Sequence, residues 1–375
     1  VGENIGYAHN ESIGLGNTNS EFGGPLSSAI NLDPITPVVI TDPTVAGAPP
    51  YSNNPVVRDA QGRPYGISDI VQQEMLNPLA YAQTRLGNHG YADNIIGNVF
   101  AEIKPIDGLT LRSTMGAKMA FYGNRDFTPV YYLSATNQNL DKARISGGLN
   151  RRLDWNVENT ISYTKSLGGH NFTVLVGQGA YKDNMTYSFG VTKANIPVDN
   201  YDDASFIYNV TTDDITASAG EGVIHTVSSL FTRLNYNFDE KYLFTAVVRR
   251  DGSSRFGANN KYGVFPSASI GWVTSNEGFW QRNQIIHFLK VRGGYGVVGN
   301  DNLGDFRFLS TIGSGRNYTF GNGDASVNGY SPDAPANPDL RWELISQLNI
   351  GFASTLFNEF TLNSYWYSKQ NTVRI

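Results

Sequence analysis

Hydrophobic and polar residues alternate with a period of two between Val227 and Val273. In the first part of this stretch, one set of alternate positions is largely apolar: Leu230, Thr232, Leu234, Tyr236 and Phe238. The positions between them are mostly polar: Ser229, Phe231, Arg233, Asn235 and Asn237. A period of two is the signature of a β-strand whose two faces meet different surroundings. Segments 242–251 and 264–273 show the same pattern, so the sequence predicts three strands in succession.

The connections between these strands alternate in length. A tight turn at 239–241 follows the first strand, and a polar segment at 251–263 follows the second. Each strand has about ten residues, which at about 3.3 Å per residue and a tilt of about 45° would cross the apolar core of a bilayer. Aromatic residues gather beside the short connections: Tyr236, Phe238, Tyr242 and Trp272. This combination is typical of an outer-membrane β-barrel, although the strands of a soluble antiparallel sandwich also alternate.

The same alternation recurs along the rest of the chain. It is clearest in six segments: 94–104, 109–119, 149–164, 172–187, 288–298 and 340–353. Short and long connections alternate here too, and Pro105 to Gly108 has the residues of a tight turn. The predicted fold class is therefore all-β: a partial antiparallel transmembrane β-barrel, with about a dozen strands of a larger barrel and long extracellular loops.

Two long regions are predicted to be extracellular loop regions. Residues 10–92 contain nine prolines, more than central strands tolerate. Residues 299–338 are rich in Gly, Asn and Asp. Within the first region we expect one or two helical turns at 67–76, and within the second we expect one strand near 306–312.

The composition agrees with a membrane-embedded β-structure and excludes several other classes. Of the 375 residues, 16% are charged, against about 25% in an average soluble protein. No apolar run approaches the roughly 20 residues of a membrane helix, so a spanning segment must be a strand of a closed barrel. The chain has no cysteine and a net charge of -5. These values exclude disulfide and thiolate chemistry and give no basic field for nucleic acid.

The sequence contains no catalytic motif. Its five histidines lack HExxH spacing, and no GxSxG elbow occurs. Gly294, Gly296 and Gly299 have the spacing of a dinucleotide fingerprint, but turn-forming residues follow them where a helix is required. We therefore expect no enzyme and no nucleotide site. Paired carboxylates for glycoside hydrolysis stay open, because they meet only in the fold.

Six blocks of the sequence form a set with a characteristic order. The most specific block is Arg249 to Gly257, with the sequence RRDGSSRFG. The other blocks lie at 105–109, 233–244, 265–267, 290–296 and 337–343. Together they resemble the SusC/RagA family of TonB-dependent outer-membrane transporters of Bacteroidetes. The order and spacing of these blocks agree with the family over residues 93–375.

The resemblance implies a barrel of roughly 22 strands closed around a plug. It implies import of an oligomeric nutrient, a glycan or a peptide, across the bacterial outer membrane and in contact with its lipid. The TonB–ExbB–ExbD complex would act through the plug, and a SusD-like surface lipoprotein would form a lid. The chain starts in a strand-like run, Val1 to His9, and shows no plug or TonB box. We therefore expect residues 1–375 to be part of one barrel domain, with the plug domain absent from this chain.

A second class of function stays open on the sequence alone. A secreted or surface β-rich protein that binds or degrades polysaccharide would show similar alternation. The two hypotheses differ in what the apolar strand faces contact, which is lipid in a barrel and a second sheet in a sandwich.

Four charged residues fall on the predicted polar face of the strands: Arg233, Arg249, Asp251 and Arg292. They are candidates for contact with substrate or plug in the lumen. The alternative is a charge ladder across neighbouring strands that keeps the interior wet and the register fixed. Arg250 falls on the apolar face and is expected at the membrane rim, because an arginine facing lipid at the midplane would cost about 2–4 kcal/mol.

Two adjacent aromatic residues, Tyr131 and Tyr132, lie in a predicted long loop. Their rings could stack on a sugar or pack on a peptide, which makes them candidates for substrate capture or lid contact, as are Tyr318 and Tyr330. Anchoring at the rim or packing within the loop is the alternative.

Acidic residues in the predicted loops could bind Ca²⁺, because hard cations prefer clustered oxygen ligands. The candidate sets are Asp301 with Asp305, and Asp202-Asp203 with Asp213-Asp214. Solvated loop carboxylates are the alternative, since the EF-hand spacing is absent. No other cofactor or metal is expected.

Overall fold

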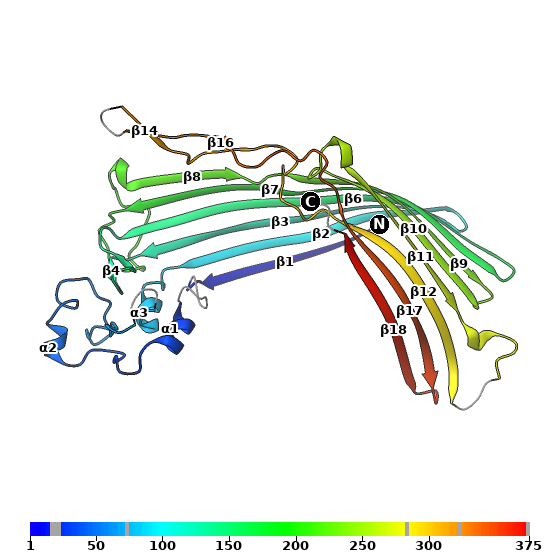
Figure 1. Ribbon diagram of the computed structural model, residues 1–375, viewed down its shortest axis with the longest axis horizontal. Coiled ribbons are helices and arrows are strands. Elements are labelled where there is room, and N and C mark those ends of the chain that lie inside the picture. The colour runs from blue at the N-terminus through cyan, green and yellow to red at the C-terminus, as the bar shows by residue number, and fades with distance from the viewer. Residues whose placement is uncertain (16–23, 72–74, 282–284, 322–324, 373–375) are drawn as a thin grey trace.

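The computed structural model describes residues 1–375 with the exception of 16–23, 72–74, 282–284, 322–324 and 373–375. Its main body is one twelve-stranded sheet that twists and curves as a single layer (Figure 1). Eleven strands neighbour one another in the order of the chain, and β8 pairs beside them with β7. Every pairing in this sheet is antiparallel, which confirms the predicted strand arrangement.

The strands of the sheet are β1 (Gly2–Ile13), β2 (His89–Ile106), β3 (Leu109–Thr128), β6 (Arg144–Leu167), β7 (His170–Ala194), β8 (Ile215–Glu221), β9 (His225–Phe238), β10 (Tyr242–Ser253), β11 (Tyr262–Trp272), β12 (Ile286–Asn300), β17 (Glu343–Leu356) and β18 (Phe360–Thr372). The other elements are short and lie in the connections. They are α1 (Pro25–Asn31), α2 (Pro43–Ala46), α3 (Pro78–Gln83), β4 (Tyr131–Tyr132), β5 (Gln138–Asn139), β13 (Ile312–Gly313), β14 (Tyr318–Phe320), β15 (Ala325–Val327), β16 (Ser331–Pro332) and three 3₁₀ turns, Thr212–Asp214, Ala258–Asn260 and Thr274–Asn276.

The two ends of the sheet differ in their connections. At one end, here called the hairpin end, tight turns join β2 to β3, β6 to β7, β9 to β10 and β17 to β18. Asp239 and Glu240 have φ values of 52° and 55°, and Gly108 has 82°, values that suit the twist of a tight hairpin. The opposite end, the loop end, carries most of the long connections. The predicted alternation of short and long connections is thus present except between β11 and β12, whose connection at the hairpin end is longer than a tight turn.

The hydrogen-bond register aligns the apolar positions across the sheet. Leu234 pairs with Ala246, which pairs in turn with Ala268, and Tyr295 pairs with Ala268 and with Leu348. The adjacent row is polar or small: Asn235, Thr245, Ser269, Gly294 and Asn349. A slip of one residue would exchange the two faces. We call the side of the apolar row the outer face and the side of the polar row the inner face.

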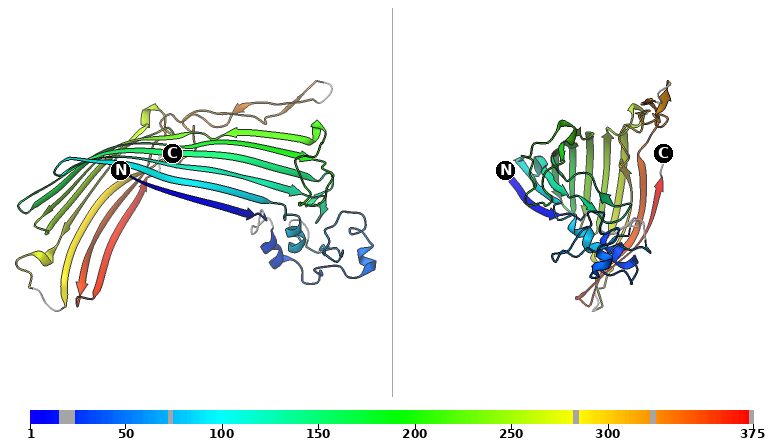
Figure 2. Two further views of the ribbon diagram at one scale, coloured as in Figure 1. Left: turned by 180° about the vertical axis from the view of Figure 1, so that it is seen from behind. Right: turned by 90° about the vertical axis from the view of Figure 1, so that its left-hand side faces the viewer.

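No second sheet covers the outer face within the described ranges. Ile270, Val264 and Ile350 on this face are 64%, 57% and 52% exposed, and the two views of Figure 2 show a single curved layer. A sandwich requires a core between two sheets. The structure therefore does not fit the sandwich alternative, and it leaves the apolar face free to meet lipid. Among the described residues, no helix has the length and apolarity needed to cross a membrane.

Several predicted boundaries were too short. β6 and β7 have 24 and 25 residues, about twice the length that crosses a bilayer, so both extend beyond it at the loop end. The predicted loop 10–92 was wrong at its limits, because β1 continues to Ile13 and β2 begins at His89. Its interior contains α1, α2 and α3, while the described part of 67–76 has no helix. Pro78, at the first turn of α3, is where a proline starts a helix.

The predicted loop 299–338 also differs in detail. β12 runs to Asn300, and the strand expected near 306–312 is a turn until Ile312. Two small ladders follow, β13 with β16 and β14 with β15. They extend from the loop end in the same direction as β8 (Figures 1 and 2).

A carboxylate clasp closes the hairpin end between β11 and β12. Glu277 accepts hydrogen bonds from the Tyr242 hydroxyl at 2.6 Å and from Trp272 Nε1 at 2.9 Å. Lys241 Nζ lies 3.9 Å from the same carboxylate. The hydrogen bond from Tyr242, then that from Trp272, lowers the pKa of Glu277. Two aromatic residues predicted to gather at this end are thereby fixed to the connection.

Replacing Glu277 with Gln should lower stability at neutral pH and have less effect in acid. Because the pKa of Glu277 is lowered in the folded protein, its contribution is present above the carboxyl pKa of the unfolded chain, about 4.3. That contribution disappears as the pH falls through the lower folded value. The measurement is the unfolding midpoint of the full-length protein against pH, with Glu240→Gln in the next turn as the control. A difference between wild type and Glu277→Gln that stays constant into acid would contradict the assignment.

An arginine introduced on the outer face should reduce the unfolding free energy much more than one introduced on the inner face. Ala246 lies on the outer face midway along β10, so Ala246→Arg in a lipid bilayer should cost about 2–4 kcal/mol of unfolding free energy. Thr245→Arg, one residue away on the inner face, should cost no more than about 0.5 kcal/mol. The measurement is equilibrium unfolding of the full-length protein in phospholipid vesicles. Equal losses for both variants would show that the faces are assigned wrongly.

Candidate functional site

A polar network lies on the inner face near the loop end, where β7 changes partner. Residues 170–183 of β7 pair with β9, and residues 187–193 pair with β8. Between them Asn184 has a φ of 59°, and the register between β6 and β7 shifts beside it. Such a bulge turns the strand and redirects its side chains. His225, the first residue of β9, sits at this point.

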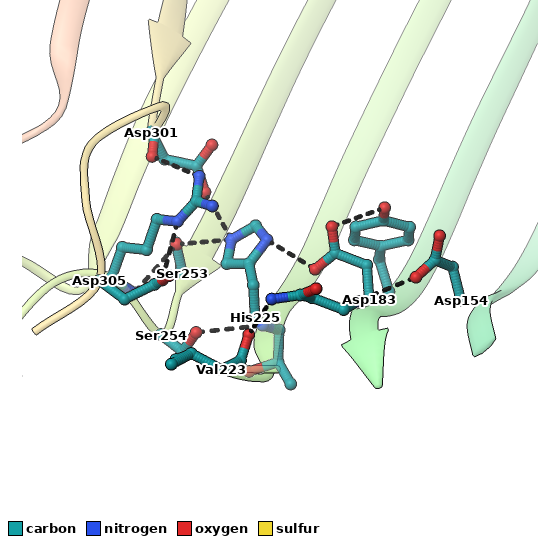
Figure 3. Close-up of polar contacts among 12 residues, drawn as sticks. Asp154, Asp183, Val223, His225, Ser253, Ser254, Asp301 and Asp305 are labelled. Atoms are coloured by element: carbon teal, nitrogen blue, oxygen red, sulfur yellow. Dashed lines mark hydrogen bonds and ion pairs between the residues drawn. The ribbon is translucent and has the colours of Figure 1, made fainter. Parts of the chain in front are cut away.

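The ring of His225 is held between two carboxylates (Figure 3). Its Nδ1 lies 3.1 Å from Asp183 Oδ1, and its Nε2 lies 2.9 Å from Asp301 Oδ2 and 3.2 Å from Ser253 Oγ. His225 is only 6% exposed and Ser253 is fully buried. An imidazole donates to both carboxylates only when both ring nitrogens carry a proton. Through these two contacts, His225 joins Asp183 of β7 to Asp301 in the segment that follows β12.

The network continues along β6 and β7. The Tyr181 hydroxyl donates to Asp183 at 3.0 Å. Asp154 accepts from the backbone N–H of Asn184 at 2.8 Å and from Arg152 Nε at 3.0 Å. Asp154 is buried, and a buried carboxylate is stable only with such donors. The bulge is therefore fixed by a side chain of the neighbouring strand.

On the other side of His225, the network reaches the long connection 301–342. Arg255 Nε lies 3.0 Å from Asp305 Oδ1, and Arg255 Nη1 donates to the carbonyl of Asp301 at 3.1 Å. Ser254 Oγ accepts from the backbone N–H of Thr226 at 3.0 Å. Four strands and two loops are thus tied together by hydrogen bonds, several of which are charge-assisted and therefore stronger than neutral ones.

A hydrophobic cluster supports this network. Its buried members are Phe256, Phe265, Leu340 and Trp342. The ring of Trp342 lies 4.9 Å from that of Phe256 and 5.2 Å from that of Phe265. These residues come from three of the family-like blocks, at 249–257, 265–267 and 337–343. Blocks that are far apart in the sequence therefore meet in one place at the loop end.

The predicted lumen-facing residues lie on the inner face but are not one ladder. Arg249 Nε lies 2.7 Å from Asp251 Oδ2 on the same strand, and its Nη2 donates to Ser229 Oγ at 2.8 Å. Arg233 Nε donates to Asn235 at 3.1 Å. The alternative of a charge ladder across neighbouring strands is not what these contacts form, because the ion pair between Arg249 and Asp251 runs along a single strand, β10. The side chain of Arg292 has no hydrogen bond or ion pair with the described residues.

A groove on the inner face contains Arg292. It lies toward the hairpin end between β6 and β18 and has a volume of about 730 Å³. Its side chains on the inner face are mostly uncharged and polar, such as Asn171, Thr173 and Asn235, together with the cations Lys290 and Arg292. These polar side chains can form successive hydrogen bonds with a polar molecule that moves along the groove.

The two loop tyrosines are part of packed loop structure. Tyr131 is 7% exposed, its hydroxyl donates to Asn137 at 3.2 Å, and it packs in a cluster with Tyr81 and Leu133. Tyr132 packs against a neighbouring cluster. The burial of Tyr131 removes its ring from external ligands in this structure and agrees with the loop-packing alternative. Tyr318 and Tyr330 are exposed.

Four of the six acidic residues considered for Ca²⁺, namely Asp203, Asp214, Asp301 and Asp305, have other partners. Asp301 and Asp305 bind His225 and Arg255. Asp214 pairs with Lys142, and this pairing, ahead of hydrogen bonds from other neighbours, lowers the pKa of Asp214. No three His, Asp or Glu side chains of the described residues are placed to hold a metal ion. The glycines at 294, 296 and 299 lie within β12, as the absence of a following helix indicated.

The sequence interpretation missed His225, Asp183, Asp154 and Arg255. His225 stands alone in the sequence, and its two carboxylate partners are 42 and 76 residues away. A usable signal was the position of Ser253 and Arg255 inside the most specific block. The partners of these two residues depend on strand pairing and on the course of a long loop.

Known proteins of similar sequence are several times longer. TonB-dependent receptor P39 of Formosa agariphila is 32% identical over 284 residues, which cover 75% of this chain and 26% of the relative. TonB-dependent receptor SusC of Bacteroides thetaiotaomicron is 26% identical over 89% of this chain and 32% of the relative. The solved structure of the RagAB peptide transporter matches with a TM-score of 0.68 and 25% identity over 82% of this chain and 33% of that one. The chain thus spans about a third or less of each relative.

The family match covers most of the chain. Residues 40–373 match the family described as TonB dependent receptor-like, beta-barrel. The single curved antiparallel sheet, with one apolar and one polar face, is the structure that such a match requires. The chain belongs to the β-barrel family of the TonB-dependent receptors and is homologous to SusC.

Proposed function

We propose that this chain forms part of the wall of a bacterial outer-membrane importer that takes up an oligomeric nutrient, a glycan or a peptide. The observation that carries the proposal is the family match over residues 40–373. SusC-like receptors and the RagAB peptide transporter are among the similar proteins. The family consists of receptors and transporters, which are not enzymes. The partners proposed by this analogy are a SusD-like lipoprotein and, through a plug, the TonB–ExbB–ExbD complex.

The two faces of the sheet support this role. The outer face offers exposed aliphatic side chains to lipid, and the inner face lines a polar groove. Lys290 and Arg292 are the cations of that groove, and the side chain of Arg292 has no hydrogen-bond or ion-pair partner in the described ranges. We propose that Arg292 contacts the substrate or the plug, while Arg249 and Asp251 hold the register of the wall. Arg233 lies on the same inner face.

The loop end supports the proposed lid. The described parts of the connections between β1 and β2 and between β12 and β17 lie at this end (Figure 1). We propose that the predicted loop regions 10–92 and 299–338 are extracellular and contact the lipoprotein. The connection between β12 and β17 is held at its start by the contacts of Asp301 and Asp305 and at its end by Leu340 and Trp342. A loop that is fixed at both ends can present a defined surface to a partner.

Growth on a defined carbon source tests the import function. A strain that lacks the full-length receptor should lose growth on one class of oligomer, either a glycan or a peptide mixture, and should grow normally on the monomers. Growth should return with the restored receptor but not in cells without TonB. Recovery of the receptor as a soluble or secreted polysaccharide-degrading protein would favour the second function class.

Loss of the contact between His225 and Asp301, here called the clamp, should reduce import without unfolding the barrel. Asp301→Asn removes one charge from the buried His225 contact, which should cost about 1–3 kcal/mol locally. We expect the segment 301–342 to be cleaved faster by external protease and uptake to fall several-fold. The readouts are cleavage on intact cells and heat-modifiable migration of the receptor. Asp203→Asn is the control, since Asp203 bonds to Asn200 in a different loop. Unchanged cleavage in Asp301→Asn would contradict the clamp.

A further inference from the structure

A second pocket lies on the outer face, on the opposite side of the sheet from the His225 network. It has a volume of about 390 Å³ and lies at the loop end. Tyr262, Val264, Leu344, Thr372 and Arg341 are among the residues that line it. The register places Val264 opposite Arg250 and Leu344 opposite Thr372, in the rows that continue the apolar positions of the outer face. The pocket therefore opens where the lipid-facing side meets the rim.

Two cations lie at this rim without an acidic partner. Arg341 lines the pocket and is exposed. The guanidinium of Arg250 lies 3.8 Å from the ring centroid of Tyr262, which is another lining residue. Neither arginine has an ion pair with any residue in the described ranges. The nearby carboxylates have other hydrogen-bond partners, since Glu343 bonds to Asn300 and Asp339 to Asn259. Both guanidinium groups are therefore available to an anionic ligand.

Apolar side chains lie directly next to these cations. Val264 is 57% exposed and Leu344 is 39% exposed. Farther toward the hairpin end, the same rows continue with Ala268, Ile270 and Leu348. A site with cations at the rim and aliphatic side chains below matches an amphiphile with an anionic head group. A soluble anion would contact the cations but not the aliphatic side chains. An acidic protein would contact the cations from above the rim and would likewise leave the aliphatic side chains uncovered.

We propose that this pocket binds the phosphorylated head group of a lipid of the outer leaflet, with its acyl chains along the outer face. Arg341 supplies a planar guanidinium that can donate two parallel hydrogen bonds to one phosphate. Arg250, held over Tyr262, adds a second charge beside the pocket, as cation–π contacts fix such side chains. An arginine near the interface costs far less than one at the midplane, where no water or head group can solvate it. The proposal rests on the proposed outer-membrane function.

Binding to nanodiscs of defined lipid tests this site. The full-length receptor is placed in phosphatidylcholine nanodiscs that contain either phosphorylated lipid A or its dephosphorylated form, and bound lipid is counted by native mass spectrometry. We expect retention of the phosphorylated form only, an about tenfold loss in Arg341→Gln and partial recovery in Arg341→Lys, because a lysine keeps the charge but lacks the fork. Arg250→Gln should give a smaller loss.

The control is Arg316→Gln, which removes the same charge from the turn between β13 and β14, outside the pocket. Equal retention of both lipid forms, or a wild-type level of retention in Arg341→Gln, would overturn the proposal. Displacement of the lipid by inorganic phosphate alone would show a free-anion site and would also overturn the proposal. If Arg341→Gln lost a copurifying protein while its bound lipid was unchanged, the rim would be assigned to a protein partner and the lipid proposal would be wrong. Outer-membrane location and oligomer uptake are measured separately on the same variants, so failure of the lipid site is distinguishable from failure of the import function.

Discussion

The hydrogen-bonded register of the antiparallel sheet is the constraint on which the rest of the structure depends. Each strand fixes the facing of the next, so a row such as Leu234, Ala246 and Ala268 stays on one side across the wall. A slip of one residue would bring Arg233 and Arg249 to the side of those apolar residues. The same register therefore decides where lipid can lie, where the polar groove opens and which side carries each arginine.

Polar interactions are concentrated where this regular pairing is interrupted. The bulge at Asn184, the change of partner from β9 to β8 and the start of β9 all fall at one level of the sheet. Backbone groups that leave the ladder need other partners, and Asp154 supplies one directly. His225 then connects the interrupted wall to the long connection. Disruption of the ladder and attachment of a loop are thus two aspects of one local arrangement.

The two faces also separate two kinds of chemistry. On the inner face, charges are paired within the wall or line a groove, as Arg249 and Arg292 illustrate. On the outer face, Arg250 and Arg341 occur only at the rim, where water and lipid head groups meet the protein. This distribution follows from the cost of placing a charge in hydrocarbon, which falls toward the interface. The position of an arginine along its strand therefore matters as much as the face it occupies.

The sequence by itself determined the strands, their two faces and the tight turns, because these depend on alternation and on residues such as Asp107-Gly108 that act locally. In the sheet, Arg233, Arg249, Asp251 and Arg292 share the inner face and Arg250 lies on the outer face, as alternation along each strand requires. Only the tertiary structure decided that His225 meets Asp183 and Asp301, that Tyr131 is buried, and that Phe256 packs with Trp342. Local patterns fix the direction of a side chain relative to its own strand. The partner that it meets depends on which distant segment the sheet and its loops bring to that side.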